Sequence, residues 1–184
     1  VDRFPDMGIL GSKGVAVPWN QIDEAEMEIL KETDTIVVHN PESNMGNAVG
    51  CAAILKLLEK GILLGLGTDG YATDMLESFK VTNMLHKHNL CDPSVAWMES
   101  AQMLFDNNPK IVNRYFKKPL GIIENGAYAD IIVVDYDPLT PINENNINGH
   151  LLFGTMGRQV VSTMINGKFV MKDRELASID EKEI

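Results

Sequence analysis

Two short, almost wholly apolar runs constrain the fold of this chain more than any other feature of its sequence. Residues 35–39 and 62–66 are rich in Val, Ile and Leu, and neither run alternates with polar residues. Such runs are typical of strands that are covered on both faces, as in a parallel sheet. A segment long enough for a helix follows each run. The sequence therefore predicts right-handed parallel β-α units.

The first part of the chain continues this alternation. Up to about residue 118 the expected order is β-α-β-α-β-α, and Pro109 is expected to break the last helix because proline removes a helical hydrogen bond. Asp23 is the expected N-cap of the first helix. The strands are expected at 15–17, 35–39 and 62–66, and the helices at 24–31, 48–60, 74–88 and 93–116.

From Pro119 onward, glycines separate short apolar segments. Asn166-Gly167 lies between two of these segments and predicts a type I′ hairpin, because both residues tolerate positive φ. The strands are expected at 130–134, 160–165 and 168–171, and a helix is expected to start within 175–184. We therefore expect an α/β chain with two parts, residues 1–118 and residues 119–184.

Charge and cysteine content limit the partners of the chain. The net charge is −10 and no basic run is present, which argues against nucleic acid and against anionic membrane surfaces. No apolar run approaches the ~20 residues that span a bilayer. Cys51 and Cys91 lie far apart and form no C-x-x-C motif. We therefore expect a reduced, cytoplasmic protein.

Polar side chains follow the two buried strands. Asp69 comes directly after residues 62–66, between Gly67 and Gly70, and His39 ends the preceding strand. Ligand sites of α/β folds collect at the carboxyl ends of strands, so both residues are site candidates. From position alone, Asp69 could equally be a turn or capping residue, and a single histidine is more often structural. The loop after His39 adds three further candidates: Asn40, Ser43 and Asn44.

Two other motifs have competing interpretations. Residues 65–70 match the G-x-G-x-x-G pattern of dinucleotide-binding domains, but that function requires a helix that opens at Gly70. His86-Lys87-His88 matches the H-x-H pattern of a metal-binding pair. Residues two apart on a helix point away from each other, so we interpret the pair as part of a solvated helix end.

Taken together, residues 37–44 (VVHNPESN) and 65–70 (GLGTDG) resemble the last two barrel strands of the amidohydrolase superfamily. The closest resemblance is to the aminohydrolase branch with chlorohydrolases, guanine deaminase and SsnA-like aminohydrolases. Residues 126–135 and 152–170 resemble the C-terminal β-sandwich segment of that family.

The resemblance implies the last three or so strands of a metal-dependent (β/α)8 barrel plus a small β-sandwich segment. It also implies a deaminase-like hydrolase of carbon–nitrogen bonds other than peptide bonds, acting on an amine or heterocycle. Asp69 matches the metal ligand and proton shuttle of the family, with zinc as the expected divalent metal. His39 matches the histidine of the seventh barrel strand and is expected to line the pocket. Asn40, Ser43 and Asn44 are candidate substrate-binding residues in the loop that follows, with the shaping of an Asx turn as the alternative.

The chain also departs from the family pattern. The H-x-H pair of the first barrel strand and the ligands of the fifth have no counterpart, and Pro18-Trp19-Asn20-Gln21 stands where a histidine motif is usual. Asn and Gln do not exchange protons near neutral pH. We therefore expect the isolated chain to be a C-terminal portion with little turnover, which requires an N-terminal half or a homo-oligomer to be stable. A non-catalytic fragment is the alternative.

Overall fold

The structure is a computed structural model, which describes residues 4, 6–17, 22–177 and 179. The unusual motif at residues 18–21 lies outside this part of the chain. Two compact units are present, Val1–Tyr115 and Phe116–Ile184.

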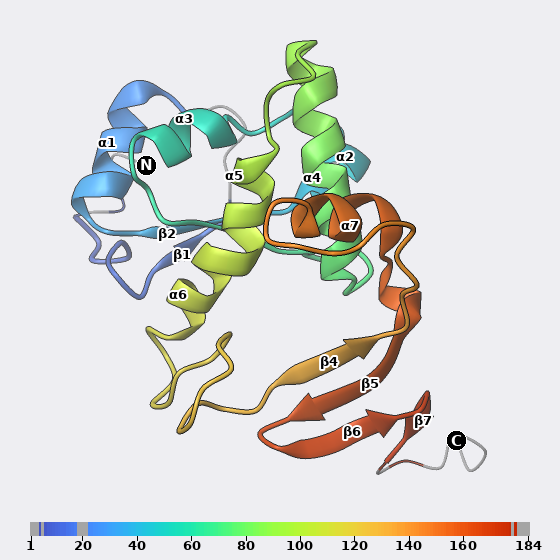
Figure 1. The fold of residues 1–184 in the computed structure, drawn as a ribbon. Helices are drawn as coiled ribbons and strands as arrows, with labels where there is room; N and C mark the ends of the chain where they lie inside the picture. The colour runs from blue at the N-terminus through green and yellow to red at the C-terminus, as the bar shows by residue number, and fades with distance from the viewer. Residues whose placement is uncertain (1–3, 5, 18–21, 178, 180–184) are drawn as a thin grey trace. The chain divides into compact units, whose positions relative to one another are not determined.

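Strands and helices alternate in the first unit (Figure 1). A π-helical turn, η1, connects two short helices near its end. In chain order the elements are β1 (Val15–Ala16), α1 (Glu24–Glu32), β2 (Ile36–His39), α2 (Pro41–Gly46), α3 (Ile54–Glu59), β3 (Leu64–Leu66), α4 (Met75–Leu90), α5 (Met98–Ala101), η1 (Gln102–Asn107) and α6 (Asn108–Val112).

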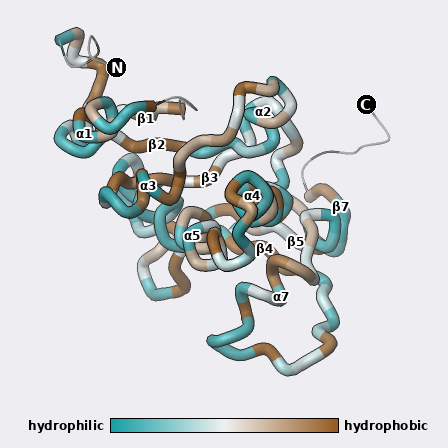
Figure 2. Tube along the Cα trace, turned by 90° about the horizontal axis from the view of Figure 1, so that it is seen from above, coloured by the Kyte–Doolittle hydropathy of each residue, from teal (hydrophilic) through white to brown (hydrophobic). Residues whose placement is uncertain are grey.

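The strands of this unit form a parallel sheet in the order β1-β2-β3 within the described residues. Val37 pairs with Leu64, and His39 pairs with Leu66. Ile36 and Leu64 have 0% exposure, and Figure 2 shows β1 and β2 as apolar segments. The prediction of buried parallel strands within residues 35–39 and 62–66 is confirmed. Helices cover the apolar side chains of β2 and β3.

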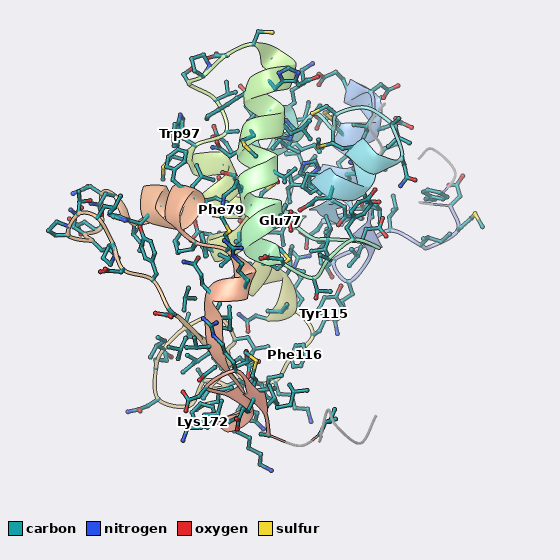
Figure 3. The ribbon with its side chains drawn as sticks, turned by 90° about the vertical axis from the view of Figure 1, so that its right-hand side faces the viewer. Glu77, Phe79, Trp97, Tyr115, Phe116 and Lys172 are labelled. Atoms are coloured by element: carbon teal, nitrogen blue, oxygen red, sulfur yellow. The ribbon has the colours of Figure 1, made fainter. Side chains whose placement is uncertain are left out.

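Carboxylate caps start the two longest helices of this unit. Asp23 caps α1, as predicted, and the structure adds a reciprocal capping box with Glu26. Asp74 accepts hydrogen bonds from two backbone N–H groups at the start of α4. Figure 3 marks Phe79 on α4, and its side chain is almost fully buried. No helix in the described residues is both long and apolar enough to cross a bilayer.

Local backbone conformation changes two of the expected helices. Pro41 does not lead into a loop but starts the short helix α2, where its missing N–H costs nothing. The helix expected from residue 48 begins only at Ile54. Ala48 and Gly50 have φ values of 53° and 99°, which an α-helix cannot accommodate. The result is an irregular segment between α2 and α3.

Two asparagine side chains bind the edge of β3. Asn108 accepts from the backbone N–H of Leu66 and donates to its carbonyl, both at 2.9 Å. Asn107 donates to the Leu64 carbonyl at 2.8 Å. A Cβ at Gly65 would lie 2.5 Å from Asn108 Oδ1, so glycine permits this close approach. Pro109 follows within the first turn of α6, and the helical path continues through the expected break.

The second unit is mainly antiparallel. Its sheet has the order β4-β5-β6-β7, and Asn166 and Gly167 have φ values of 49° and 77°, as the predicted type I′ hairpin requires. The expectation of a helix from residue 175 is wrong for its first two residues. Glu175 and Leu176 form a strand that pairs with β6. The elements are β4 (Ile131–Val134), α7 (Ile147–Gly154), the 3₁₀ turn η2 (Gly157–Gln159), β5 (Val160–Ile165), β6 (Lys168–Lys172) and β7 (Glu175–Leu176).

We predict that Asn108→Ala destabilises the chain by about 2 kcal/mol, because it leaves a buried N–H and a carbonyl of Leu66 without their partner. Urea unfolding measures the loss, and amide hydrogen exchange should show faster exchange at Leu66. Asn108→Asp keeps the acceptor for the Leu66 N–H and should retain more of its protection. Asn89→Ala, at an exposed position of α4, is the control. Equal protection of Leu66 in Asn108→Ala and the wild type would contradict this role.

Candidate functional site

The parallel register brings the carboxyl ends of β2 and β3 to one edge of the sheet. His39 pairs with Leu66, and the Gly67 N–H donates to the His39 carbonyl at 2.9 Å. The loop and helix that follow β2 therefore start beside the turn that follows β3. This edge is where ligand sites of parallel α/β folds lie.

Asp69 lies in the turn after β3 and faces the segment after β2. The Ser43 hydroxyl donates to Asp69 Oδ2 at 2.9 Å, although Asp69 itself is exposed. Its φ of 52° is uncommon for a residue other than glycine. The hydrogen bond orients the carboxylate, and no partner is present for Oδ1 among the described residues.

Ser43 is held in place by the helix that carries it. It lies on α2 and is 6% exposed. Asn47 donates to the Ser43 carbonyl at 2.9 Å and to its hydroxyl oxygen at 3.3 Å. The hydroxyl therefore accepts from Asn47 while it donates to Asp69. This arrangement fixes the direction in which Ser43 points its proton.

Asn40 and Asn44 are buried beside the same edge. A Cβ at Gly67 would lie 2.5 Å from Asn40 Oδ1, so the amide of Asn40 packs directly on the backbone of the β3 turn. A similar contact joins the two loops further out, where a Cβ at Gly46 would lie 1.6 Å from the Tyr71 hydroxyl. Gly67 permits the first approach, whereas Gly46 meets only the far end of the exposed Tyr71 side chain.

His39 is fully buried but is bonded to α4 rather than to Asp69. Its Nε2 lies 3.2 Å from His86 Nε2, and the ring centroids are 5.1 Å apart. Successive side chains of a strand alternate between its faces, so His39 and Val38 point to opposite sides of the sheet. No hydrogen bond or ion pair between His39 and Asp69 is present in the part of the chain that the structure describes.

Sequence reasoning missed His86. The expectation of a solvated helix end is wrong for this residue, which is 2% exposed, and right for His88, which is exposed. His86 follows Phe79 by seven positions and Thr82 by four, so all three lie on one buried face of α4. That spacing was the signal that could have identified it.

The buried histidine pair favours the neutral state. Burial, with a smaller contribution from His86, lowers the pKa of His39 to about 3. Burial lowers the pKa of His86 to about 4. Both rings are therefore uncharged at neutral pH, and neither acts there as a cation.

The described residues do not complete a metal site. Among them, no group of three or more His, Cys, Asp or Glu side chains is arranged to hold a metal ion. Asp69 can supply one carboxylate oxygen, and the histidine pair points toward α4. A metal at this edge would need further ligands from outside the described part of the chain.

The turn after β3 does not have the structure of a dinucleotide site. Residues 70–74 are not helical, and α4 begins only at Met75. The pyrophosphate of a dinucleotide needs a helix N-terminus directly after the third glycine. The dinucleotide-binding alternative is therefore wrong.

Asp69 therefore lies at the edge of a parallel α/β sheet where proteins of this fold class bind their ligands. The sequence pattern of the amidohydrolase family matches residues 3–170, and the chain belongs to this family. It is 34% identical to a 5'-deoxyadenosine deaminase of Methanopyrus kandleri over 189 residues, which covers 100% of this chain and 43% of that protein. It is 38% identical to a 5-methylthioadenosine/S-adenosylhomocysteine deaminase of Thermococcus onnurineus over 178 residues, which covers 93% and 41%.

A solved structure has a similar fold. The adenosine deaminase from Xanthomonas campestris with bound zinc superposes with a TM-score of 0.83 at 26% identity, and the match covers 99% of this chain and 42% of that one. The chain thus spans less than half the length of the relatives that it matches.

The histidine pair predicts a loss of stability in acid. In the unfolded chain both histidines bind a proton as the pH falls below 6.5. In the folded chain His86 is protonated only near its pKa of about 4, and His39 only near its pKa of about 3. The free energy of unfolding should therefore fall by about 1 kcal/mol per pH unit for each histidine. Urea unfolding between pH 6.5 and 5 measures this slope.

His86→Gln should flatten the slope, whereas His88→Gln replaces an exposed histidine of the same helix and is the matched control. Identical slopes in the wild type and in His86→Gln would show that the buried ring does not resist protonation.

Proposed function

We propose that this chain is the C-terminal portion of a metal-dependent hydrolase that removes an amino group from a small heterocyclic substrate. In this proposal β1, β2 and β3 are the last three strands of a (β/α)8 barrel, and the second unit is part of a β-sandwich. The observation that carries it is the Asp69 carboxylate, held by Ser43 at the carboxyl edge of the sheet in a chain of the amidohydrolase family.

The names of the relatives favour a nucleoside substrate. They are deaminases of 5'-deoxyadenosine, of 5-methylthioadenosine and S-adenosylhomocysteine, and of adenosine. Each of these substrates carries an exocyclic amine on a purine ring. We therefore assign an adenosine-type nucleoside as the substrate class, with hydrolysis of the carbon–nitrogen bond to that amine as the reaction.

Asp69 is the proposed catalytic residue and the proposed metal ligand of this chain. Ser43 donates to Oδ2 and leaves Oδ1 for the ion or for a proton. A divalent metal such as zinc supplies a water molecule of lowered pKa when it is bound. Asp69 would hold such an ion through Oδ1, and a carboxylate at this position can take up a proton from water and release it to the leaving amine.

Two buried amides are proposed to contact the substrate. Asn40 packs against Gly67, and Asn44 lies on α2 beside Ser43. An amide offers both a donor and an acceptor, which suits the edge of a purine ring. His39 lies on the side of β2 that faces α4, where its ring is hydrogen-bonded to His86. Any contact of His39 with the substrate therefore depends on how this hydrogen bond orients the ring.

We predict that Asp69→Asn in the whole protein lowers kcat by about 10²- to 10⁴-fold, since an amide cannot accept the proton. Steady-state deamination of adenosine and 5'-deoxyadenosine, with zinc measured by elemental analysis, tests this. Asp92→Asn changes a carboxylate in the exposed turn after α4 and should keep full activity. A fully active Asp69→Asn enzyme would refute the assignment.

The isolated 184-residue chain should bind zinc well below one equivalent, because its described residues offer Asp69 without further ligands at that edge. Elemental analysis of the purified chain after zinc loading and desalting gives the ratio. Size-exclusion chromatography reports whether the chain associates with itself. Stoichiometric zinc together with turnover would show that the chain holds a complete site.

A further inference from the structure

A partly buried cysteine and two buried histidines, outside the proposed catalytic carboxylate, form a continuous row of hydrogen bonds. Cys51 Sγ lies 3.4 Å from His86 Nδ1, and His86 Nε2 lies 3.2 Å from His39 Nε2. The row starts in the irregular segment before α3, crosses α4 and ends on the last residue of β2. It thus reaches the strand end that borders the proposed site.

We propose that Cys51 and His86 are positioning residues that hold His39 in one tautomer, with its proton on Nδ1. His39 then offers an N–H donor and has no free basic nitrogen. Only one part of this inference rests on the proposed function: the hydrogen bond from the His39 Nδ1–H to an acceptor on the heterocyclic substrate.

The first step concerns the protons that are available. Both imidazoles are buried and neutral, so each ring carries one proton on one of its two nitrogens. Only one of the two facing Nε2 atoms can be protonated, because a hydrogen bond needs one donor and one acceptor. Two arrangements are therefore allowed, and they differ in the direction of every bond in the row.

The thiol decides between these two arrangements. Burial raises the pKa of the Cys51 thiol, so the sulfur keeps its proton. The nearest acceptors for that proton are His86 Nδ1 at 3.4 Å and the Ala52 carbonyl at 3.9 Å. A neutral sulfur is also a weak acceptor, which disfavours donation from the ring to Cys51. The S–H therefore donates to His86 Nδ1.

The remaining bonds follow from that direction. With Nδ1 of His86 as acceptor, its proton is on Nε2 and is donated to His39 Nε2. The proton of His39 is then on Nδ1. This atom is buried and has no hydrogen-bond partner among the described residues. A buried N–H without a partner costs about 1–3 kcal/mol, so an acceptor supplied on binding would be favoured.

Long-range ¹H–¹⁵N correlation spectra of the histidine-labelled whole protein test the tautomer directly, with His39→Gln and His86→Gln used for assignment. We expect His39 protonated on Nδ1 and His86 protonated on Nε2. Cys51→Ser keeps a donor and should leave this pattern unchanged. Cys51→Ala removes the donor and should give averaged shifts at His39. Cys91→Ala, at the exposed cysteine, is the control.

A wild-type chain with His39 protonated on Nε2 would overturn the inference, as would a Cys51→Ala chain that keeps the wild-type pattern. The wild-type spectrum decides the question alone if Cys51→Ala fails to fold. The readout needs no activity, so failure of the deaminase assay and failure of the tautomer assignment are separate results. In an active whole protein, Cys51→Ala should raise KM for the nucleoside more than it lowers kcat.

Discussion

The parallel pairing of β2 with β3 is the constraint on which the candidate site depends. Because His39 is in register with Leu66, the segments that follow both strands begin side by side. The hydrogen bond from Ser43 to Asp69 joins those two segments across 26 positions of sequence. A slip of one residue would reverse the faces of the strand and separate Asn40 from Gly67, which are in close contact.

The edge of the sheet divides polar side chains into two groups with different environments. Asp69 is exposed and is oriented by a buried hydroxyl, which is consistent with the proposed role of this carboxylate in proton exchange and ion binding. His39 and His86 are buried on the side of α4, where desolvation keeps them neutral. The two groups therefore suit the different tasks proposed for them, proton transfer at Asp69 and fixed hydrogen bonding at His39.

Much of the fold could be predicted because the decisive signals are local. Apolar runs placed β2 and β3, Asp23 marked the start of α1, and Asn166-Gly167 marked a hairpin. Helices near α2 and α3 were misplaced, since positive φ at Ala48 cannot be read from a residue that usually favours helices. The pairing of Glu175 with β6 was missed because charged residues carry little strand propensity by themselves.

The sequence by itself determined the parallel α/β pattern and the motif by which the family was recognised, and it made Asp69 the leading candidate for the site. The tertiary structure alone decided which polar groups meet, because hydrogen-bond partners such as Cys51 and His86 are 35 positions apart. It also decided that Asn107 and Asn108 bind the edge of β3. Such pairings depend on how helices pack on a sheet, and residue spacing along the chain does not encode that packing.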